Sequence, residues 1–245
     1  MRLLFVHWFL LFALYGFWGY ILDSAYSCLR RQKLTNNGLL ALPIMPIHGF
    51  TAVISAFFTS IYVGNPVFVF LFAILISCVM RVVSVYLPEI AFGIILHDYQ
   101  KFKFSLHGRV NFYASTIDAA VVTVLILFVH NPVSSQLAAA PLAVVLPVAV
   151  ALCIAIGYDT FMVSRHLSRL NSLLSLMENA KMNIRATSVQ APLRRDGAKY
   201  HRLFHAFPAI GHKHHPEMLI KIKEQLIENG KQIDTPVSAP PDLDG

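Results

Sequence analysis

Charged residues are scarce in this sequence. They make up 13% of its 245 residues, whereas hydrophobic residues make up 56%. A soluble domain carries about 25% charged residues, so this composition excludes an ordinary water-soluble globular protein. The net charge of +7 does not indicate nucleic-acid binding, because membrane proteins collect Lys and Arg in their cytoplasmic loops.

Cysteine is almost absent too, with only Cys28, Cys78 and Cys153. This odd number, spread over a loop and two apolar runs, indicates small buried hydrophobic residues rather than disulfides or metal ligands. The sequence also lacks a Walker A motif, so the chain cannot itself be an ATPase. Any ATP-driven role would need a separate nucleotide-binding partner, and we expect no cofactor.

Long apolar runs are what the sequence has in abundance. Each is about as long as the ~20 residues that a helix needs to cross a bilayer. The runs are Leu3–Leu22, Ile44–Val63, Val67–Leu87, Tyr113–Val129 and Ala138–Met162. We therefore predict an all-α polytopic membrane protein with about five transmembrane helices, a membrane domain over 1–162 and a tail over 163–245. The first run is too long for a cleaved signal peptide and lacks a cleavage site.

The distribution of basic residues predicts the orientation. The first and third loops are basic, and the tail holds twelve Lys and Arg. The loops at 64–66 and 130–137 hold none, which places the N-terminus outside and the C-terminus in the cytoplasm. Arg2 argues weakly for the reverse. We predict a multi-pass protein of the bacterial cell membrane.

The tail should begin as a continuation of the last span. A coiled-coil-like stripe predicts a juxtamembrane helix over about 163–185, which packs on the chain's own cytoplasmic loops or forms a dimer seam. Its members are Val163, Leu167, Leu170, Leu174, Met177 and Ile184. We expect loose structure from 187 to 215, a short helix over about 216–229, and a disordered end. The tail is too short and too poor in apolar residues to bury a large core.

Ionisable residues fall on the cytoplasmic half of the predicted bundle. We predict a polar cluster that comprises Asp23, Arg81, Glu89, Asp98, Arg109 and Asp118. A charge in hydrocarbon is costly, so Arg81 should pair with one of these carboxylates and the cluster should form a pocket open to the cytoplasm. The alternative is ordinary interfacial charge whose ends reach water.

Two segments are rich in residues with special backbone or chemical properties. The loop motif consists of Asn36, Gly38, Pro43, Pro46, His48 and Gly49. Its Asn, Gly and Pro residues specify one conformation, either a tight loop that leads into a helix or a short re-entrant segment. The interfacial motif, in a segment too short to span, consists of His97, Asp98, Tyr99, His107, Gly108 and Arg109.

At these residues the sequence resembles the ABC-transporter type IV family of bacterial polytopic membrane proteins. The family pattern at the end of the first span matches Gly19, Asp23 and Tyr26. Its loop pattern, Asn-Arg-Gly-Phe-Leu then Gly-Pro and Pro-Ile-Tyr-Gly, matches Asn36, Gly38, Leu40, Pro43, Pro46, Ile47 and Gly49. Its later Glu, Trp-Asp-Tyr and Gly-Arg-Ile pattern matches Glu89, Asp98, Tyr99, Gly108, Arg109 and Val110.

The resemblance covers roughly residues 10–132 and identifies the chain as a divergent member. The departures are Asn37 for an Arg, Leu42 for a Gly, His48 for a Tyr, His97 for a Trp, and Arg81 at an acidic position. The resemblance implies transport, with ATP hydrolysed by another subunit.

Three functions compete. The first is a permease-like or transport-associated subunit that uses the polar cluster and assembles with further copies of itself or with an ATPase. The second is a membrane scaffold or regulator that presents its tail to a partner. The third is a protein that binds or modifies lipid head groups, although no recognisable catalytic signature supports an enzyme. Transport predicts a pocket across the membrane, catalysis predicts convergence of His97 and Asp98 with His48 or His107, and scaffolding predicts neither.

The tail histidines allow two interpretations. His201 and His205 would share a helix face at a spacing that can hold zinc, but no local carboxylate or cysteine completes a site. Basic and aromatic residues interleave with them, namely Lys199, Tyr200, Arg202, Phe204 and Phe207. This pattern favours a segment at the membrane surface that contacts anionic lipids.

Overall fold

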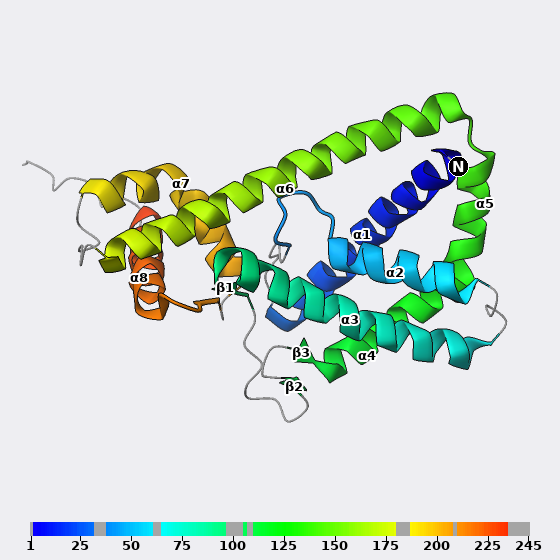
Figure 1. The fold of residues 1–245 in the computed structure, drawn as a ribbon, viewed down its shortest axis with the longest axis horizontal. Helices are drawn as coiled ribbons and strands as arrows, with labels where there is room; N and C mark the ends of the chain where they lie inside the picture. The colour runs from blue at the N-terminus through cyan, green and yellow to red at the C-terminus, as the bar shows by residue number, and fades with distance from the viewer. Residues whose placement is uncertain are drawn as a thin grey trace, which may run out of the picture.

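The computed structural model describes residues 2–31, 38–60, 65–96, 105–106, 110–179, 187–207 and 210–234. It is an all-α polytopic membrane protein (Figure 1). The helices are α1 (Arg2–Arg31), α2 (Pro46–Thr59), α3 (Pro66–Phe92), α4 (Phe112–Val124), the π-helix η1 (Leu125–His130), α5 (Asn131–Ala139), α6 (Leu142–Asn179), α7 (Thr187–Ala206) and α8 (Pro216–Asp234). Short strands form two antiparallel pairs, β1 (Ile94–Ile95) with β4 (Gly211–His212), and β2 (Ser105–Leu106) with β3 (Val110–Asn111).

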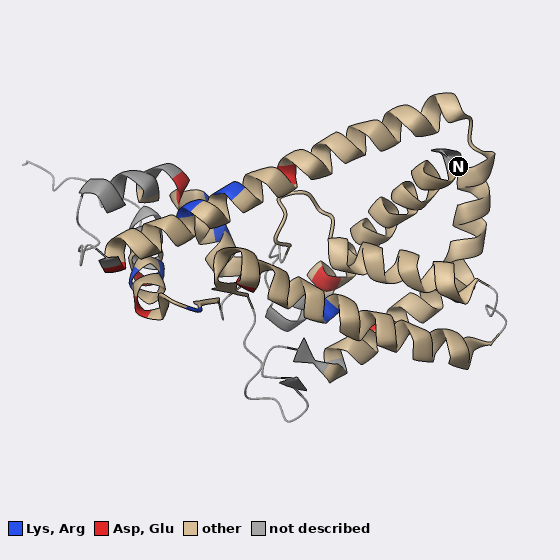
Figure 2. Cartoon of the chain, viewed as in Figure 1, with Lys and Arg blue, Asp and Glu red and all other residues tan. Residues whose placement is uncertain are grey.

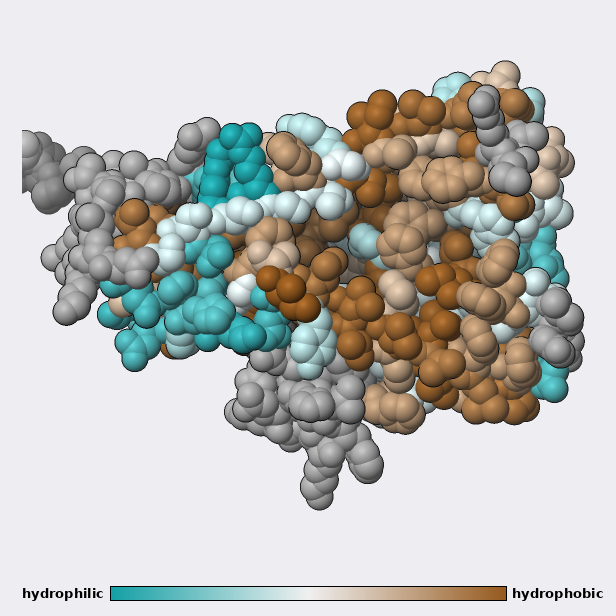
Figure 3. Space-filling model, in the orientation of Figure 1, coloured by the Kyte–Doolittle hydropathy of each residue, from teal (hydrophilic) through white to brown (hydrophobic). Residues whose placement is uncertain are grey.

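The molecule has an apolar end and a polar end. Helices α1 to α5 form a bundle at one end, α7 and α8 lie at the other, and α6 runs between them (Figure 1). Charged residues gather at the α7–α8 end (Figure 2). The surface is hydrophobic over the bundle and hydrophilic at the α7–α8 end (Figure 3). This division fits a bundle in the bilayer and a second region in water, which we call the tail domain.

Within the described residues, four helical stretches are long and apolar enough to cross a membrane. They are Leu4–Ala25, Pro66–Phe92, Ala114–Ala139 and Leu142–Glu178. The described part of the second predicted span forms α2, of 14 residues. At about 1.5 Å per residue, this helix is about 21 Å long, short of a ~30 Å hydrocarbon core. Five crossings therefore stay a prediction.

The predicted loop at 130–137 is wrong, because the chain there is helical from α4 through η1 and α5. The wider π turn lies directly before Pro132, whose missing N–H and bulky ring would disturb a regular α-helix. The turn comes later, at Ala140, which is extended at φ −67° and ψ 141°. Pro141 follows it, and a residue before proline is biased toward this conformation.

Close contact between α1 and α2 is possible because glycines lie at their crossing. A Cβ added to Gly19 would lie 2.4 Å from the Cβ of His48, and one added to Gly49 would lie 2.6 Å from the carbonyl oxygen of Phe12. The described part of the loop motif, from Gly38 to Met45, is a tight loop that leads into α2 at Pro46. Its last residue, Met45, donates its N–H to the carbonyl of Gly16 at 3.0 Å.

The tail is more structured than the sequence suggested. The stretch expected to be loose forms α7, and the short helix expected after it extends over Pro216–Asp234 as α8. The two helices enclose a hydrophobic core with the end of α6. Its fully buried members include Leu170, Leu174, Met177, Tyr200, Leu219 and Ile222. The members of the predicted stripe that lie on α6 thus pack within the chain rather than at a dimer seam, and the last member, Ile184, lies outside the described residues.

A two-residue strand pair joins the tail domain to the end of α3. Helix α3 ends at Phe92 and is capped by Gly93, which has a left-handed φ of +68° and donates its N–H to the Glu89 carbonyl at 2.8 Å. The chain then pairs Ile94 with His212, and the N–H of Lys213 binds the Gly93 carbonyl at 2.8 Å. Because Ile94 is fully buried in the core of the tail domain, α3 and that domain share one hydrophobic core.

Candidate functional site

Arg81 and Asp118 form an ion pair between α3 and α4. Their side chains are 17% and 19% exposed, and both lie in helices long and apolar enough to cross the membrane. Asp118 is thus the carboxylate that pairs with Arg81. A pair of this kind keeps either charge from standing alone in hydrocarbon.

The rest of the predicted polar cluster does not gather around that pair. Glu89 is 7% exposed and lies 3.9 Å, carboxylate to ammonium, from Lys213 of the tail domain. Asp23 is half-buried in α1. Asp98 and Arg109 lie outside the described residues, so the polar cluster as a whole stays a prediction.

The loop motif has a structural role in the part that is described. Gly49 and His48 fit against α1, Pro46 begins α2, and Gly38 is buried. Asn36 lies outside the described residues. So do His97, Asp98, Tyr99, His107, Gly108 and Arg109, which form the whole interfacial motif, and its convergence with His48 is untested.

The tail histidines do not form a metal site in the described part of the chain. His201 and His205 are exposed on α7, with ring centroids 6.0 Å apart. No group of three His, Cys, Asp or Glu side chains among the described residues could hold a metal ion. The zinc interpretation therefore lacks a third ligand there.

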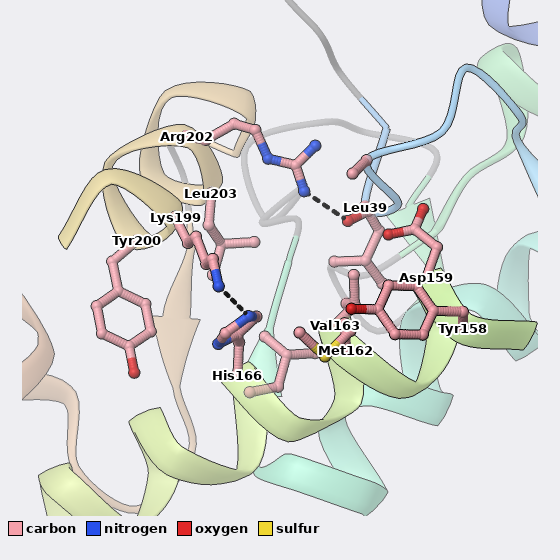
Figure 4. A pocket seen from close by; sticks show the side chains of 12 residues that line it. Leu39, Tyr158, Asp159, Met162, Val163, His166, Lys199, Tyr200, Arg202 and Leu203 are labelled. Carbon is pink, nitrogen blue, oxygen red and sulfur yellow. Dashed lines mark hydrogen bonds between the residues drawn. The ribbon is translucent and has the colours of Figure 1, made fainter. Parts of the chain in front are cut away.

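A cleft of about 230 Å³ lies where the tail domain meets the membrane bundle (Figure 4). We call it the junction cleft. Its walls are the loop before α2, the middle of α6, and α7. They are formed by Leu39, Ala41, Tyr158, Asp159, Met162, Val163, His166, Leu167, Lys199, Tyr200, Arg202 and Leu203. Most of the lining surface is apolar, and the polar side chains come from α6 and α7.

Two hydrogen-bonding residues hold the loop before α2 against the helices beside it. Arg202 donates from Nη1 to the Leu40 carbonyl at 3.0 Å and from Nη2 to the Leu39 carbonyl at 3.3 Å. The buried Asp159 carboxylate accepts the N–H of Leu42 at 2.8 Å. The loop is therefore bonded to both α7 and α6.

A second polar group joins α6 to α7 beside the cleft. Lys199 Nζ lies 2.9 Å from His166 Nε2, as Figure 4 shows. Asp196, which is buried, lies 3.4 Å from Arg169 and 3.9 Å from Lys199. Burial, with a smaller contribution from Asp196, raises the pKa of Tyr200 to about 12, so this phenol stays neutral at physiological pH.

Sequence reasoning did not find these roles of Asp159 and Arg202. Asp159 could be interpreted as interfacial charge and Arg202 as part of a membrane-surface segment. Both side chains bond the loop before α2, whose carbonyl and N–H groups have no helical partners. The sequence could indicate that this loop needs hydrogen-bond partners, but it does not indicate which distant side chains provide them.

Another group missed by sequence reasoning lies at the opposite end of the bundle. Tyr15, almost fully buried, has its hydroxyl 2.8 Å from His130 Nδ1. His7 Nε2 lies 2.9 Å from Ser134 Oγ, and the Trp8 ring stacks on His130. These contacts join α1 to the π-helix and α5, and they account for polar side chains in an otherwise apolar bundle.

His212 is held neutral where the tail domain meets α3. Its Nδ1 accepts the backbone N–H groups of His214 and His215 at 3.2 and 3.0 Å. Nδ1 therefore carries no proton, and Nε2 donates to Asn171 Oδ1 at 3.1 Å. Burial lowers the pKa of His212, and His215 and His214 lower it further, against the opposite effects of the Phe92 carbonyl and Glu178.

This arrangement predicts a loss of stability in mild acid. The unfolded chain binds a proton at His212 near the ordinary pKa of about 6.5, before the folded chain does. The contribution of His212 to the free energy of unfolding is therefore fully present above about pH 6.5. It declines as the pH falls from there toward the lower pKa that His212 has in the folded chain. Thermal unfolding of the full chain between pH 7.5 and 5.5 should show a shallower decline for His212→Asn.

The pH experiment needs a control variant at another histidine, because other titratable groups surround His212. His215, whose ring stacks on His212, pairs with Glu178. The control is His201→Asn, which changes an exposed histidine of α7. Equal pH slopes for His212→Asn and the wild type would contradict the assignment.

Comparison with known proteins gives one match. A family model described as "Putative ABC-transporter type IV" matches residues 10–164. No curated protein and no solved structure matches the chain. The matched range covers the bundle and reaches along α6 as far as the junction cleft, and it ends before the tail helices α7 and α8.

Proposed function

Because this chain belongs to the ABC-transporter type IV family, we propose that it is a permease-like membrane subunit of a transport system in the bacterial cell membrane. Its tail domain faces the cytoplasm in this proposal. There it links the membrane helices to a separate ATPase, since the chain has no Walker A motif of its own.

The observation that carries the proposal is the number of connections between the tail domain and the bundle. Helix α6 runs unbroken from the apolar end into the tail domain. The β1–β4 pair joins that domain to the end of α3, and Arg202 joins it to the loop before α2. A displacement of the tail domain would therefore act on α6, on α3 and on the loop before α2 together, as coupling through contiguous packed elements requires.

The Arg81–Asp118 ion pair also fits a role in transport. Paired charges within membrane helices are rare and commonly mark a substrate path or a moving interface. Here the pair lies between α3 and α4, and α3 is the helix that ends at the tail domain. We assign the pair to the cytoplasmic half of the transport path, or to the α3–α4 interface that opens it.

The test is native mass spectrometry of the full chain, gently extracted from membranes of its own host. The proposal predicts a co-purifying subunit that carries a Walker A motif, and ATP hydrolysis by the complex. Arg202→Gln should reduce that hydrolysis, whereas Arg165→Gln, at an exposed position of α6, should not. A homo-oligomer alone, or a complex without an ATPase, would overturn the proposal.

A second candidate function is favoured by the tail domain itself. Its hydrophobic core and hydrophilic surface (Figure 3) would suit a scaffold or regulator that presents a folded surface to a cytoplasmic partner. In the same experiment, retention of a defined non-ATPase protein would support this function over transport.

A further inference from the structure

We propose that the junction cleft binds the phosphate head group of an anionic phospholipid from the cytoplasmic leaflet. The acyl chains of this lipid lie along the apolar surface of α6. The proposal concerns a lipid site and does not depend on whether the protein transports anything.

The position of the cleft along α6 fits a lipid head group. Up to the level of the cleft, α6 presents exposed apolar side chains, with Ile154 67% and Phe161 61% exposed. Just after this stretch come Arg165, His166 and Arg169, the first charged or titratable groups that follow Asp159 on α6. The cleft therefore lies at the level where the membrane gives way to water, which is where phospholipid head groups lie.

The cleft is continuous with the exposed apolar surface of α6. Tyr158 lines the cleft and is also 64% exposed, so it joins the two. Met162, Val163 and Leu39 extend the apolar wall inward (Figure 4). A mostly apolar wall with a few polar groups suits an amphiphile better than a small water-soluble anion.

The charges around the cleft also fit an anionic head group. Lys199 and Arg202 line the cleft, and Arg165 and Arg169 lie close enough to His166 to act on it electrostatically. Among the described residues, two carboxylates lie beside these cations, and both are engaged in the contacts described above. Asp159 binds the Leu42 N–H, and Asp196 is buried beside Arg169 and Lys199.

The cationic side chains of Arg202 and Lys199 also have further N–H groups that can donate hydrogen bonds. A guanidinium has five N–H groups, and Arg202 gives two of them to the Leu39 and Leu40 carbonyls. An ammonium has three N–H groups, and Lys199 gives one to His166. Charged N–H donors of this kind form strong hydrogen bonds with phosphate oxygens.

The size of the cleft limits what enters it. Pockets that enclose a drug-sized ligand have volumes of about 300–1,000 Å³, whereas the junction cleft has about 230 Å³. It can therefore take a phosphate and the adjoining glycerol, while the acyl chains remain outside along α6.

The experiment measures lipid binding to the full chain by native mass spectrometry in a neutral detergent. The probes are phosphatidylglycerol and phosphatidylcholine with identical acyl chains. Phosphatidylglycerol should bind more tightly, and each basic side chain removed should weaken it about fivefold. The double variant Lys199→Gln/Arg202→Gln should thus bind it about 25-fold more weakly, and the control Lys221→Gln, exposed on α8, should bind it like the wild type.

A second variant keeps the test valid if the double variant does not fold, since Arg202 also holds the loop before α2. Ala41→Phe fills the cleft from an exposed position and leaves the polar contacts intact. It should also weaken phosphatidylglycerol binding. Three results would overturn the proposal: no preference over phosphatidylcholine, an equal loss in Lys221→Gln, or full competition by soluble glycerol phosphate.

Discussion

Asp118→Asn should destabilise the membrane domain by about 3 kcal/mol, because the substitution leaves the Arg81 charge without its partner between α3 and α4. Removing one member of a buried ion pair costs more than replacing both, since the remaining charge is then uncompensated. The double variant Arg81→Met/Asp118→Leu should therefore recover most of the loss. Reversible unfolding in mixed micelles measures both differences.

A matched control for Asp118→Asn lies on the same helix. Thr116 bonds only its own helix, through Oγ1 to the Phe112 carbonyl at 3.0 Å in an exposed position. Thr116→Val should change the free energy of unfolding by less than about 0.5 kcal/mol. If Asp118→Asn costs no more than this control, the ion pair does not stabilise the bundle.

Gly49→Ala and Gly19→Ala should each destabilise the protein by about 2–3 kcal/mol, through forced separation of α1 and α2. The new methyl group would lie 2.6 Å from the Phe12 carbonyl oxygen in the first variant and 2.4 Å from the His48 Cβ in the second. Neither neighbour is the free end of a flexible side chain, so the helices themselves must shift. Thermal unfolding of the purified variants measures the effect.

The control for these glycines is Gly157→Ala on α6. An added Cβ at Gly157 meets no atom within 4 Å. Alanine also favours a helix over glycine by up to about 1 kcal/mol, so this variant should be neutral or slightly more stable. A similar loss of stability in all three variants would show that contact between α1 and α2 is not the cause.

The fold class could be predicted from the sequence because length and apolarity suffice for it. A run of about 20 apolar residues has few structures available in a bilayer other than a helix. The bounds of the helices were harder to predict. Residues 130–137 have no charge and include Asn131 and Pro132, so they resemble a loop. Instead the π-helix η1 precedes Pro132 and α5 continues past it, and the sequence has no simple signal for that adjustment.

The helical content of the tail was underestimated from the sequence for a different reason. Pro192, Gly197 and clustered basic residues weaken the local preference for a helix over 187–206. Helix α7 nevertheless packs Tyr200 and Phe204 against α6 and α8, and tertiary packing outweighs local propensity. Local sequence patterns do not show which apolar side chains will meet from segments so far apart.

Of the candidate sites, one could be predicted from the sequence and the other could not. The ion pair of Arg81 was predictable, because a charge in an apolar run requires a partner nearby in the bundle. The junction cleft was not, because it depends on contacts between the loop at 38–45 and α7, about 160 residues later. Loop and helix each look ordinary in sequence, and only their contact creates the cleft.

Hydrogen–deuterium exchange of the full chain in nanodiscs tests the central claim, that the tail domain is fastened to the bundle through the loop before α2. The N–H groups of Leu42 and Met45 bind Asp159 and the Gly16 carbonyl, so they should be protected in the wild type. In Arg202→Gln, protection over 39–45 should fall at least about tenfold, because two hydrogen bonds from a charged group are lost. Arg165→Gln should leave it unchanged. Equal protection in Arg202→Gln and the wild type would contradict the claim.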